Sequence, residues 1–231
     1  AGDKETALKL ARAAAVSGDS DARVTLADLL RSDEQYAGAA EVLSGLIAEA
    51  KTPDWRLLYA RGIAYERLNR WPEGQADLQA ALKARPDEPE LLNYLGYSWI
   101  DRGEHLKEAL AMVQKAVAAD PRSGAMVDSL GWAFYKKAQF NDAVIYLTQA
   151  VAQPGDMDPE LLNHLGDALY RAGKHDEAVE RWTQAQALLG GLKKVDPKLK
   201  DHLDRVLRQT RQGKSPDLAP VGQGIKVQQE L

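Results

Sequence analysis

The sequence of 231 residues contains no cysteine. This absence excludes disulfide bonds, thiolate catalysis and cysteine-ligated zinc. It fits an oxidising compartment such as the bacterial periplasm, where stray thiols are a hazard. Basic residues are not in excess either, because the net charge is −4. The charge balance therefore gives no reason to expect a nucleic-acid partner, since proteins that bind nucleic acids usually carry a basic face.

Long apolar segments are also missing. No run approaches the roughly 20 residues that a membrane-spanning helix needs. The opening AGDKETALKL has no methionine and lacks the basic-then-apolar pattern of a signal peptide. We therefore expect a processed or shortened chain, whose upstream segment, with any anchor or address, is not in view.

Motifs for catalysis and cofactor binding are absent as well. The histidines are His105, His164, His175 and His202, and none belongs to an HExxH motif. His164 and Asp167 lie one helical turn apart, but no third ligand stands at a metal-site spacing. No glycine-rich phosphate-binding loop occurs. We expect no enzymatic activity, no metal and no cofactor.

The sequence does contain a repeated pattern. The segments LLNYLGYSWIDRG (91–103), MVDSLGWAFYKKA (126–138) and LLNHLGDALYRAG (161–173) share one skeleton. Apolar residues three or four positions from each central glycine predict amphipathic helices, two per unit. Small residues would let the two helices of a hairpin approach closely. The glycines lie 34, 35 and 35 residues apart, at Gly62, Gly96, Gly131 and Gly166. Twelve positions after three of them stands another small residue: Gly74, Ala143 or Ala178.

This pattern resembles the tetratricopeptide repeat from about residue 20 to residue 189. The resemblance implies an all-α fold, a right-handed superhelical solenoid of helix hairpins with a C-terminal capping helix. We expect the second helix of a truncated repeat at 1–19 and five repeat units at 20–189. A capping helix should follow at 190–211, because residues 196–211 carry one apolar stripe. Residues 212–231 should form a flexible tail.

In this repeat the first helices line a concave wall, and four positions per unit should face it. Aromatic side chains there offer contact area at low entropic cost, and amides can bond to an extended peptide. An alternative interpretation is that the two tyrosines of the twelfth position, at 135 and 170, merely pack between neighbouring helices. The predicted partner-binding residues are Tyr59, Asn93, Tyr97, Asp128, Trp132, Tyr135, Asn163, Asp167, Tyr170 and Arg171.

A narrower resemblance rests on LNYLGY, on the acidic DRG turn with one inserted residue, and on DSLGW one unit later. These motifs are similar to those of proteobacterial periplasmic repeat lipoproteins, which include the adaptor of a carboxyl-terminal processing protease. The resemblance implies a periplasmic body tethered to the outer membrane, with a protease or cell-wall hydrolase as partner. The wall carries Asp101, Asp128 and Asp167, so a basic or neutral polar ligand suits it better than a carboxylate.

The residues thus favour a non-enzymatic adaptor or scaffold that binds a protein or peptide through its concave face. Two alternatives remain open at this stage. One is a cytoplasmic chaperone-like or regulatory repeat module, and the other is a self-assembling structural protein whose groove is filled by a second copy. Neither nucleic acid nor membrane contact is expected from this fragment.

Overall fold

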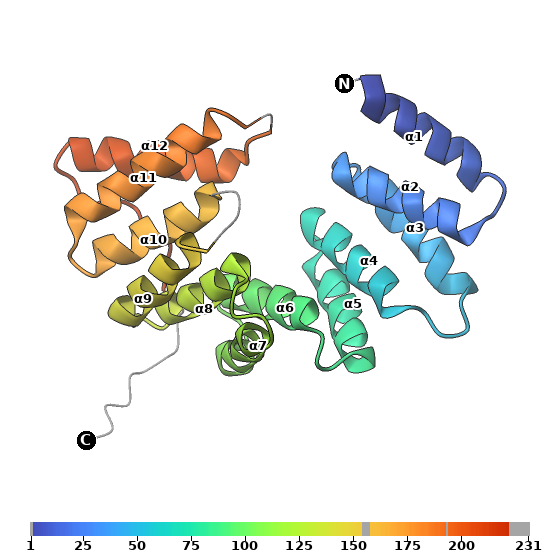
Figure 1. The fold of residues 1–231 in the computed structure, drawn as a ribbon, viewed down its shortest axis with the longest axis horizontal. Coiled ribbons are helices and arrows are strands. Elements are labelled where there is room, and N and C mark those ends of the chain that lie inside the picture. Colours follow the sequence, from blue (N-terminus) through green and yellow to red (C-terminus); the bar gives the residue numbers. More distant parts are fainter. Residues whose placement is uncertain (1, 154–157, 193, 222–231) are drawn as a thin grey trace. The chain divides into compact units, whose positions relative to one another are not determined.

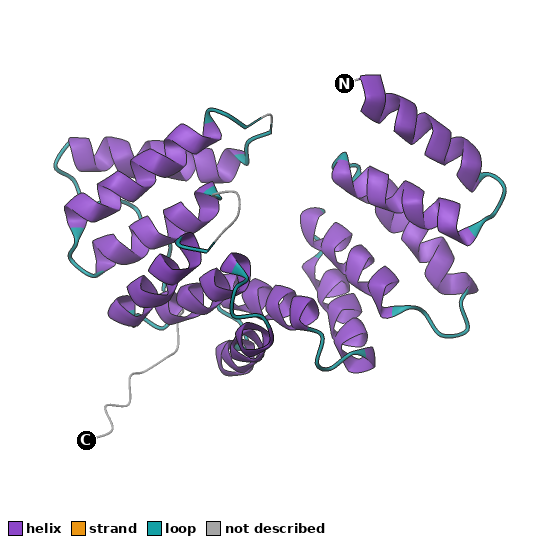
Figure 2. Ribbon diagram, in the orientation of Figure 1, coloured by secondary structure: helices purple, strands orange, loops and turns teal. Residues whose placement is uncertain are grey.

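The computed structural model describes residues 2–153, 158–192 and 194–221. These residues form twelve α-helices and no strand, as Figures 1 and 2 show. The prediction of an all-α fold is confirmed. The helices are α1 (Gly2–Ala15), α2 (Ser20–Ser32), α3 (Tyr36–Glu49), α4 (Trp55–Arg67), α5 (Trp71–Ala84), α6 (Pro89–Arg102), α7 (Leu106–Ala119), α8 (Gly124–Lys136), α9 (Phe140–Val151), α10 (Pro159–Arg171), α11 (His175–Leu189) and α12 (Pro197–Arg211).

Four of the first helices of the hairpins begin at side-chain caps. Asp19, Asp54, Ser123 and Asp158 each accept a hydrogen bond from a backbone N–H in the first turn of α2, α4, α8 and α10. Such a cap satisfies one of the backbone donors that a helix start leaves unpaired. Asp196 caps α12 in the same way.

Each hairpin turn contains a left-handed residue close after its first helix. The following residue donates its amide to a carbonyl five positions earlier, which closes the turn in a Schellman motif. This motif recurs at an interval of 34 or 35 residues. The left-handed residues are Glu34, Asn69, Gly103, Ala138 and Gly173, and the closing bonds, 2.8–3.0 Å long, run from Gln35, Arg70, Glu104, Gln139 and Lys174. In the turn between α6 and α7, His105 has left-handed backbone geometry in addition to Gly103.

Close approach of the two helices explains the regular spacing of the small residues along the chain. A Cβ added to Gly131 would lie 2.6 Å from Cγ of Leu147, and one added to Gly96 would lie 2.8 Å from Cγ2 of Val113. At Gly166 it would collide with the indole of Trp182, which is completely buried. The predicted role of these glycines, to let the hairpin close, agrees with this geometry.

Contacts divide the chain into two compact units, residues 1–91 and 92–231, called unit 1 and unit 2 here. In unit 1 each helix from α1 to α5 packs against the next. Arg61 of α4 joins three helices, because its guanidinium donates twice to Asp77 of α5, at 2.7 Å each, and once to Ser44 of α3, at 3.1 Å. Such a bidentate pair fixes the geometry of both side chains.

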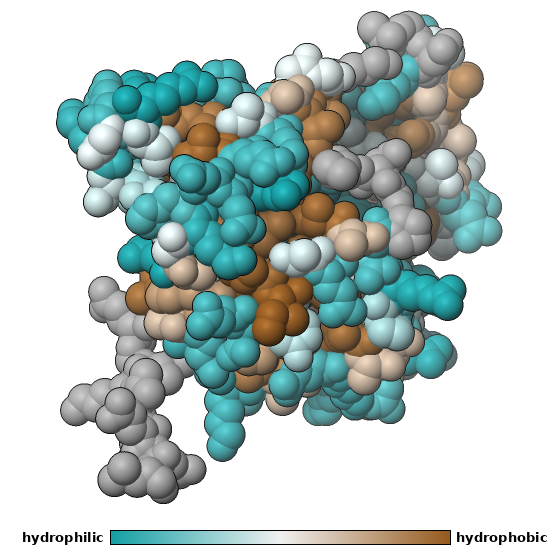
Figure 3. All heavy atoms as spheres, turned by 60° about the vertical axis from the view of Figure 1, so that its left-hand side comes forward, coloured by the Kyte–Doolittle hydropathy of each residue, from teal (hydrophilic) through white to brown (hydrophobic). Residues whose placement is uncertain are grey.

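In unit 2 each helix from α7 to α12 packs against the next, and the first helices α8 and α10 also contact each other. Helix α12 buries Leu203, Val206 and Leu207. These residues belong to the apolar stripe that the sequence shows in this helix. The space-filling view (Figure 3) shows hydrophilic residues over much of this face, with hydrophobic residues exposed between them.

Residues 212–231 form the segment for which the sequence predicts a flexible tail. Residues 212–221 follow a defined path: Gln212, Gly213, Lys214 and Asp217 form hydrogen bonds to α12, and Ala219 forms hydrogen bonds to α8 and α10. The remaining part of the predicted tail, 222–231, lies outside the described residues.

Candidate partner-binding site

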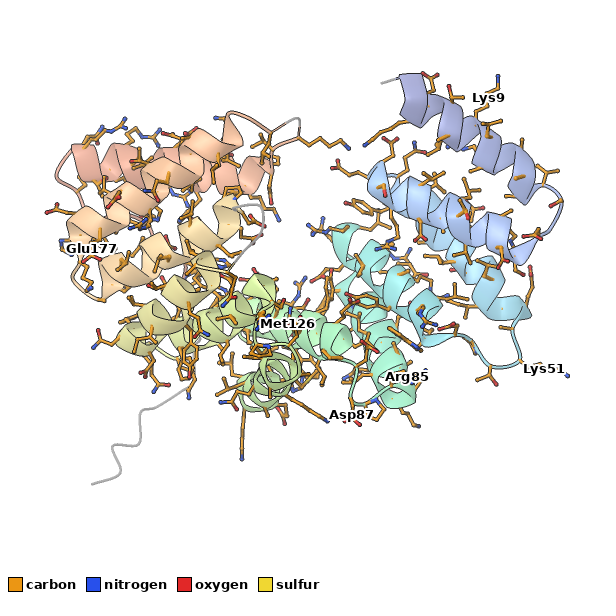
Figure 4. The ribbon with its side chains drawn as sticks, in the orientation of Figure 1. Lys9, Lys51, Arg85, Asp87, Met126 and Glu177 are labelled. Carbon is orange, nitrogen blue, oxygen red and sulfur yellow. The ribbon has the colours of Figure 1, made fainter. Side chains whose placement is uncertain are left out.

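The first helices of unit 2 bring most of the predicted residues together. Asn93 and Tyr97 lie on α6, Asp128 and Trp132 on α8, and four further residues on α10. Figure 4 shows the side chains of these helices. Its label Met126 marks the start of α8, and its label Glu177 marks the start of the neighbouring helix α11. Tyr59 belongs to unit 1.

An aromatic stack forms the centre of this arrangement. The ring of Trp132 stacks 4.0 Å from that of His164 and 4.4 Å from that of Tyr135, with interplanar angles of 17° and 8°. Only 3% of Trp132 and none of Tyr135 is exposed. Both rings are therefore packed between helices, which favours the packing interpretation of Tyr135 and extends it to Trp132.

Beside the stack lies a buried ion pair. Nδ1 of His164 is 2.8 Å from Oδ2 of Asp128 on the neighbouring first helix. Burial alone would lower the pKa of His164, but the charge and hydrogen bond of Asp128, with a smaller contribution from Glu160, raise it to about 9. His164 is therefore protonated at neutral pH, and it compensates the charge of Asp128.

Tyr97 and Glu160 continue this polar layer. The Tyr97 hydroxyl lies 3.3 Å from Oε1 of Glu160 and donates to it. Burial raises the pKa of Tyr97 well above its usual value, and it also raises the pKa of Glu160. Tyr97 remains half-buried, so it is the aromatic residue of the predicted set on α6 that keeps some contact with solvent.

Lys136, the last residue of α8, is committed to internal contacts. It is 4% exposed, and its Nζ donates to the backbone oxygen of Asp101 at 2.9 Å. The carboxylate of Asp101 also accepts from Nε1 of Trp132 at 3.4 Å. Lys136 therefore does not offer a free cation to a ligand, which leaves the exposed Arg171 as the accessible basic group of the predicted set.

Three buried oxygen atoms of the predicted set have no hydrogen-bond partner among the described residues. They are the Oδ1 atoms of Asn93, Asp128 and Asn163. These residues occupy the same repeat position, 35 residues apart, on α6, α8 and α10. A buried acceptor without a donor costs about 1–3 kcal/mol. The row is thus a set of buried acceptors that pair with no donor among the described residues.

Asp167 is the most connected residue of the set. It is fully buried, and its Oδ1 accepts from Nε1 of Trp182 at 3.0 Å and lies 3.1 Å from Nε2 of His202. Its Oδ2 accepts from the backbone N–H of Ala219 at 3.3 Å. The hydroxyl of Tyr135 donates to the carbonyl of the same alanine at 2.7 Å. The end of the chain therefore occupies the site at Tyr135 and Asp167.

Tyr170 packs within its own repeat. Its ring stacks 4.2 Å from His175 and 5.8 Å from Trp182. A hollow of about 270 Å³ opens beside it, where α10 and α11 meet the end of α12. In unit 1, the ring of Tyr59 lies 6.4 Å from that of Trp55, and burial, with the charge of Glu90, raises the pKa of Tyr59 to about 12.

Sequence reasoning misses two parts of this site. It weighs His164 for metal binding and general-base chemistry, but not as the partner of Asp128, 36 residues earlier. It places residues 217–219 in a flexible tail, because their proline-rich surroundings carry no helical period. Among the described residues, no group of three or more histidines and carboxylates is placed to hold a metal ion. No described helix has the length and apolar character that crossing a membrane requires.

Comparisons with known proteins agree with the fold. A family model described as tetratricopeptide repeat matches residues 59–124 and 129–189, more than half of the chain. The chain is similar to a thermophilic repeat protein from Thermus thermophilus, with 18% identity and a TM-score of 0.65, over 80% of this chain and 97% of that one. It is also similar to residues 41 to the end of MamA from Desulfovibrio magneticus RS-1, with 23% identity and a TM-score of 0.56, over 73% and 97% of the two chains. A comparison with curated protein sequences found no match.

Proposed function

We propose that this chain, which belongs to the tetratricopeptide repeat family, is a non-enzymatic scaffold that binds an extended segment of a protein partner across α6, α8 and α10. The fold of this family indicates a protein–protein interaction scaffold in general. The finer statement, that unit 2 holds the partner, rests on the contacts of its first helices.

The row of unpartnered acceptors carries this proposal. Asn93, Asp128 and Asn163 present buried oxygens at equivalent positions of three successive repeats. An extended peptide supplies backbone N–H groups along its length, and a lysine or arginine side chain supplies further donors. Each donor that reaches the row would remove the free-energy cost of one unsatisfied acceptor, and this gain is available only in the complex.

The electrostatics support a basic or neutral polar segment. Asp101 is half-exposed, and Glu160 and Asp128 lie in the same layer. The buried cations His164 and Lys136 are each paired with a carboxylate of this layer. An acidic segment would meet carboxylates without finding a free buried cation in this layer, so like-charge repulsion disfavours it.

We further propose that the protein acts in the periplasm as the body of an outer-membrane lipoprotein. The motifs LNYLGY, DRG and DSLGW support this, as does the lack of cysteine. Its partner would be a carboxyl-terminal processing protease or a cell-wall hydrolase. A scaffold that holds such an enzyme near the membrane raises its local concentration and needs no chemistry of its own.

The double variant Asn93→Leu, Asn163→Leu tests the acceptor row. Leucine fills a similar volume and removes two unsatisfied oxygens, so the melting temperature should be unchanged or higher. Binding should nevertheless fall, because the two acceptors for the partner are gone. The wild-type chain, the double variant and a control, Ile145→Ser on the exposed side of α9, would serve as baits in periplasmic extract, with mass spectrometry of the bound proteins.

We expect one partner to be retained by the wild type and by Ile145→Ser, and to be lost from the double variant. Equal retention by all three baits would refute the acceptor row as the binding site. A partner that binds only from the cytosolic fraction would contradict the periplasmic proposal and favour the cytoplasmic module. Substitution of Trp132 is avoided, because loss of a buried ring would disturb the fold as well as the site.

A further inference from the structure

After α12 the chain turns back towards the first helices of unit 2. Gly213 has a φ of +68°, and the amides of Gly213 and Lys214 donate to the carbonyls of Thr210 and Gln209 at 2.9 Å each. The side chain of Gln209 then binds Asp217 twice. Its nitrogen donates to Oδ2 at 2.8 Å, and its oxygen accepts from the backbone N–H of Asp217 at 2.9 Å. These contacts set the direction in which the segment continues.

Two residues further on, both backbone groups of Ala219 are bound by the site. The N–H donates to Asp167 of α10, and the carbonyl accepts from the hydroxyl of Tyr135 of α8. These two side chains come from the predicted binding positions of successive repeats. They bind the backbone of the segment, so the side chain of Ala219 does not decide the contact. This is how a peptide-binding protein holds an extended ligand.

The sequence around Ala219 favours an extended backbone. Pro220 directs the preceding residue to β or polyproline angles. Pro216 restricts its own φ and lacks an N–H. The segment KSPDLAPV, residues 214–221, is therefore prepared to lie extended before it meets the helices.

We infer that residues 214–221 are a built-in occupant of the partner site, and that the partner segment has the same chemistry and must displace them. This inference rests on the proposed function. The geometry defines that segment as an extended peptide. It contains a small residue with a backbone N–H, and the neighbouring residue favours polyproline angles. It enters where Tyr135 donates and Asp167 accepts, and the unpartnered acceptors of Asp128 and Asn163 lie on the same two helices, α8 and α10.

The built-in segment is held shallowly enough to be displaced. Asp217 and Pro220 are exposed, and Ala219 is half-buried. Its advantage is the tether, because a short flexible connection gives an effective concentration in the millimolar range. A free peptide with a dissociation constant of about 10 μM would then bind the wild-type chain about 100-fold more weakly than a chain with the segment detached.

The test uses the full chain and a fluorescently labelled peptide of sequence KSPDLAPV. Ala219→Pro removes the N–H that Asp167 accepts, whereas the matched control Ala219→Ser keeps it. We expect the peptide, followed by fluorescence anisotropy, to bind the Ala219→Pro chain at least about tenfold more tightly than the wild type. The Ala219→Ser chain should behave as the wild type does. A peptide with proline in place of its alanine should bind neither chain.

Equal affinity of the wild type and Ala219→Pro for the peptide would overturn the inference. Absence of binding to Ala219→Pro at millimolar peptide would do the same. Hydrogen exchange supplies a second measurement that needs no variant. The amide of Ala219 should exchange more slowly than in an unstructured peptide, and an unprotected amide would refute occupancy. The acceptor row is tested separately by the Asn93→Leu, Asn163→Leu baits, so the two ideas can fail independently.

Discussion

The pair of His164 and Asp128 makes the stability of this protein depend on pH in a defined direction. The pKa of His164 rises from 6.5 to about 9 in the folded chain, because Asp128 outweighs the effect of burial. A group whose folded pKa is raised stabilises the fold fully below its unfolded pKa, and this stabilisation is lost as the pH rises through the folded value. The loss should amount to about 1.4 kcal/mol per pH unit between pH 6.5 and 9, or about 3 kcal/mol in total.

Urea unfolding at half-unit steps between pH 6 and 9.5 would measure this loss. The wild type should show its free energy of unfolding falling across the window. His164→Gln should be less stable than the wild type at pH 6, since it leaves the charge of Asp128 buried and unpaired. It should also have a much flatter pH dependence. His175→Gln, at an exposed position, should keep the slope of the wild type. If His164→Gln keeps that slope as well, the assignment of the proton to this pair is wrong.

Two further predictions concern the hairpins and can be checked by urea unfolding at one pH. Ala138 has a φ of 58° in its turn, so Ala138→Gly should stabilise the fold by about 1 kcal/mol, and Gly173→Ala, at the equivalent turn, should destabilise it by a similar amount. If Ala138→Gly destabilised the fold and Gly173→Ala stabilised it, the left-handed backbone of the turn would not be what determines stability at these two positions. Gly131→Ala should cost about 2 kcal/mol, because the new methyl group meets the side chain and backbone of Leu147. The control Gly45→Ala meets only the movable end of an arginine and should be neutral or stabilising; equal losses for both would exclude overpacking as the cause.

The hairpins could be predicted from the sequence because their determinants are local and recur. Gly131 and Leu147 lie on two helices of one hairpin, and their spacing follows the helical period and the length of a short turn. The same spacing recurs around Gly62 and Gly166, so each copy supports the interpretation of the others. Amphipathic periodicity identifies helices whose apolar faces pack together. Predicting the hairpins therefore requires no information on contacts between residues far apart in the sequence.

The burial and the pairing of the side chains on the predicted wall could not be predicted from the helical period. The repeat position indicates that Trp132 and Asp128 lie on a first helix, but their burial depends on side chains one repeat away. His164 closes over Trp132 and pairs with Asp128 across 36 residues. The bonds of Ala219 to Tyr135 and Asp167 span 84 and 52 residues. A segment without helical period carries no signal for such contacts, and composition alone predicts a flexible tail.

The row of acceptors explains why the copies of the repeat differ where they do. Asn93 and Asn163 are neutral, so they can be buried at a moderate cost, whereas a carboxylate at Asp128 needs a counter-charge. His164 supplies it from the following repeat, and the equivalent positions in the two preceding copies are Tyr94 and Ser129. The charged acceptor therefore occurs at the position that the histidine can reach. Its second oxygen, Oδ1, remains unpartnered, so the pair compensates the charge without using up the acceptor that a ligand would need.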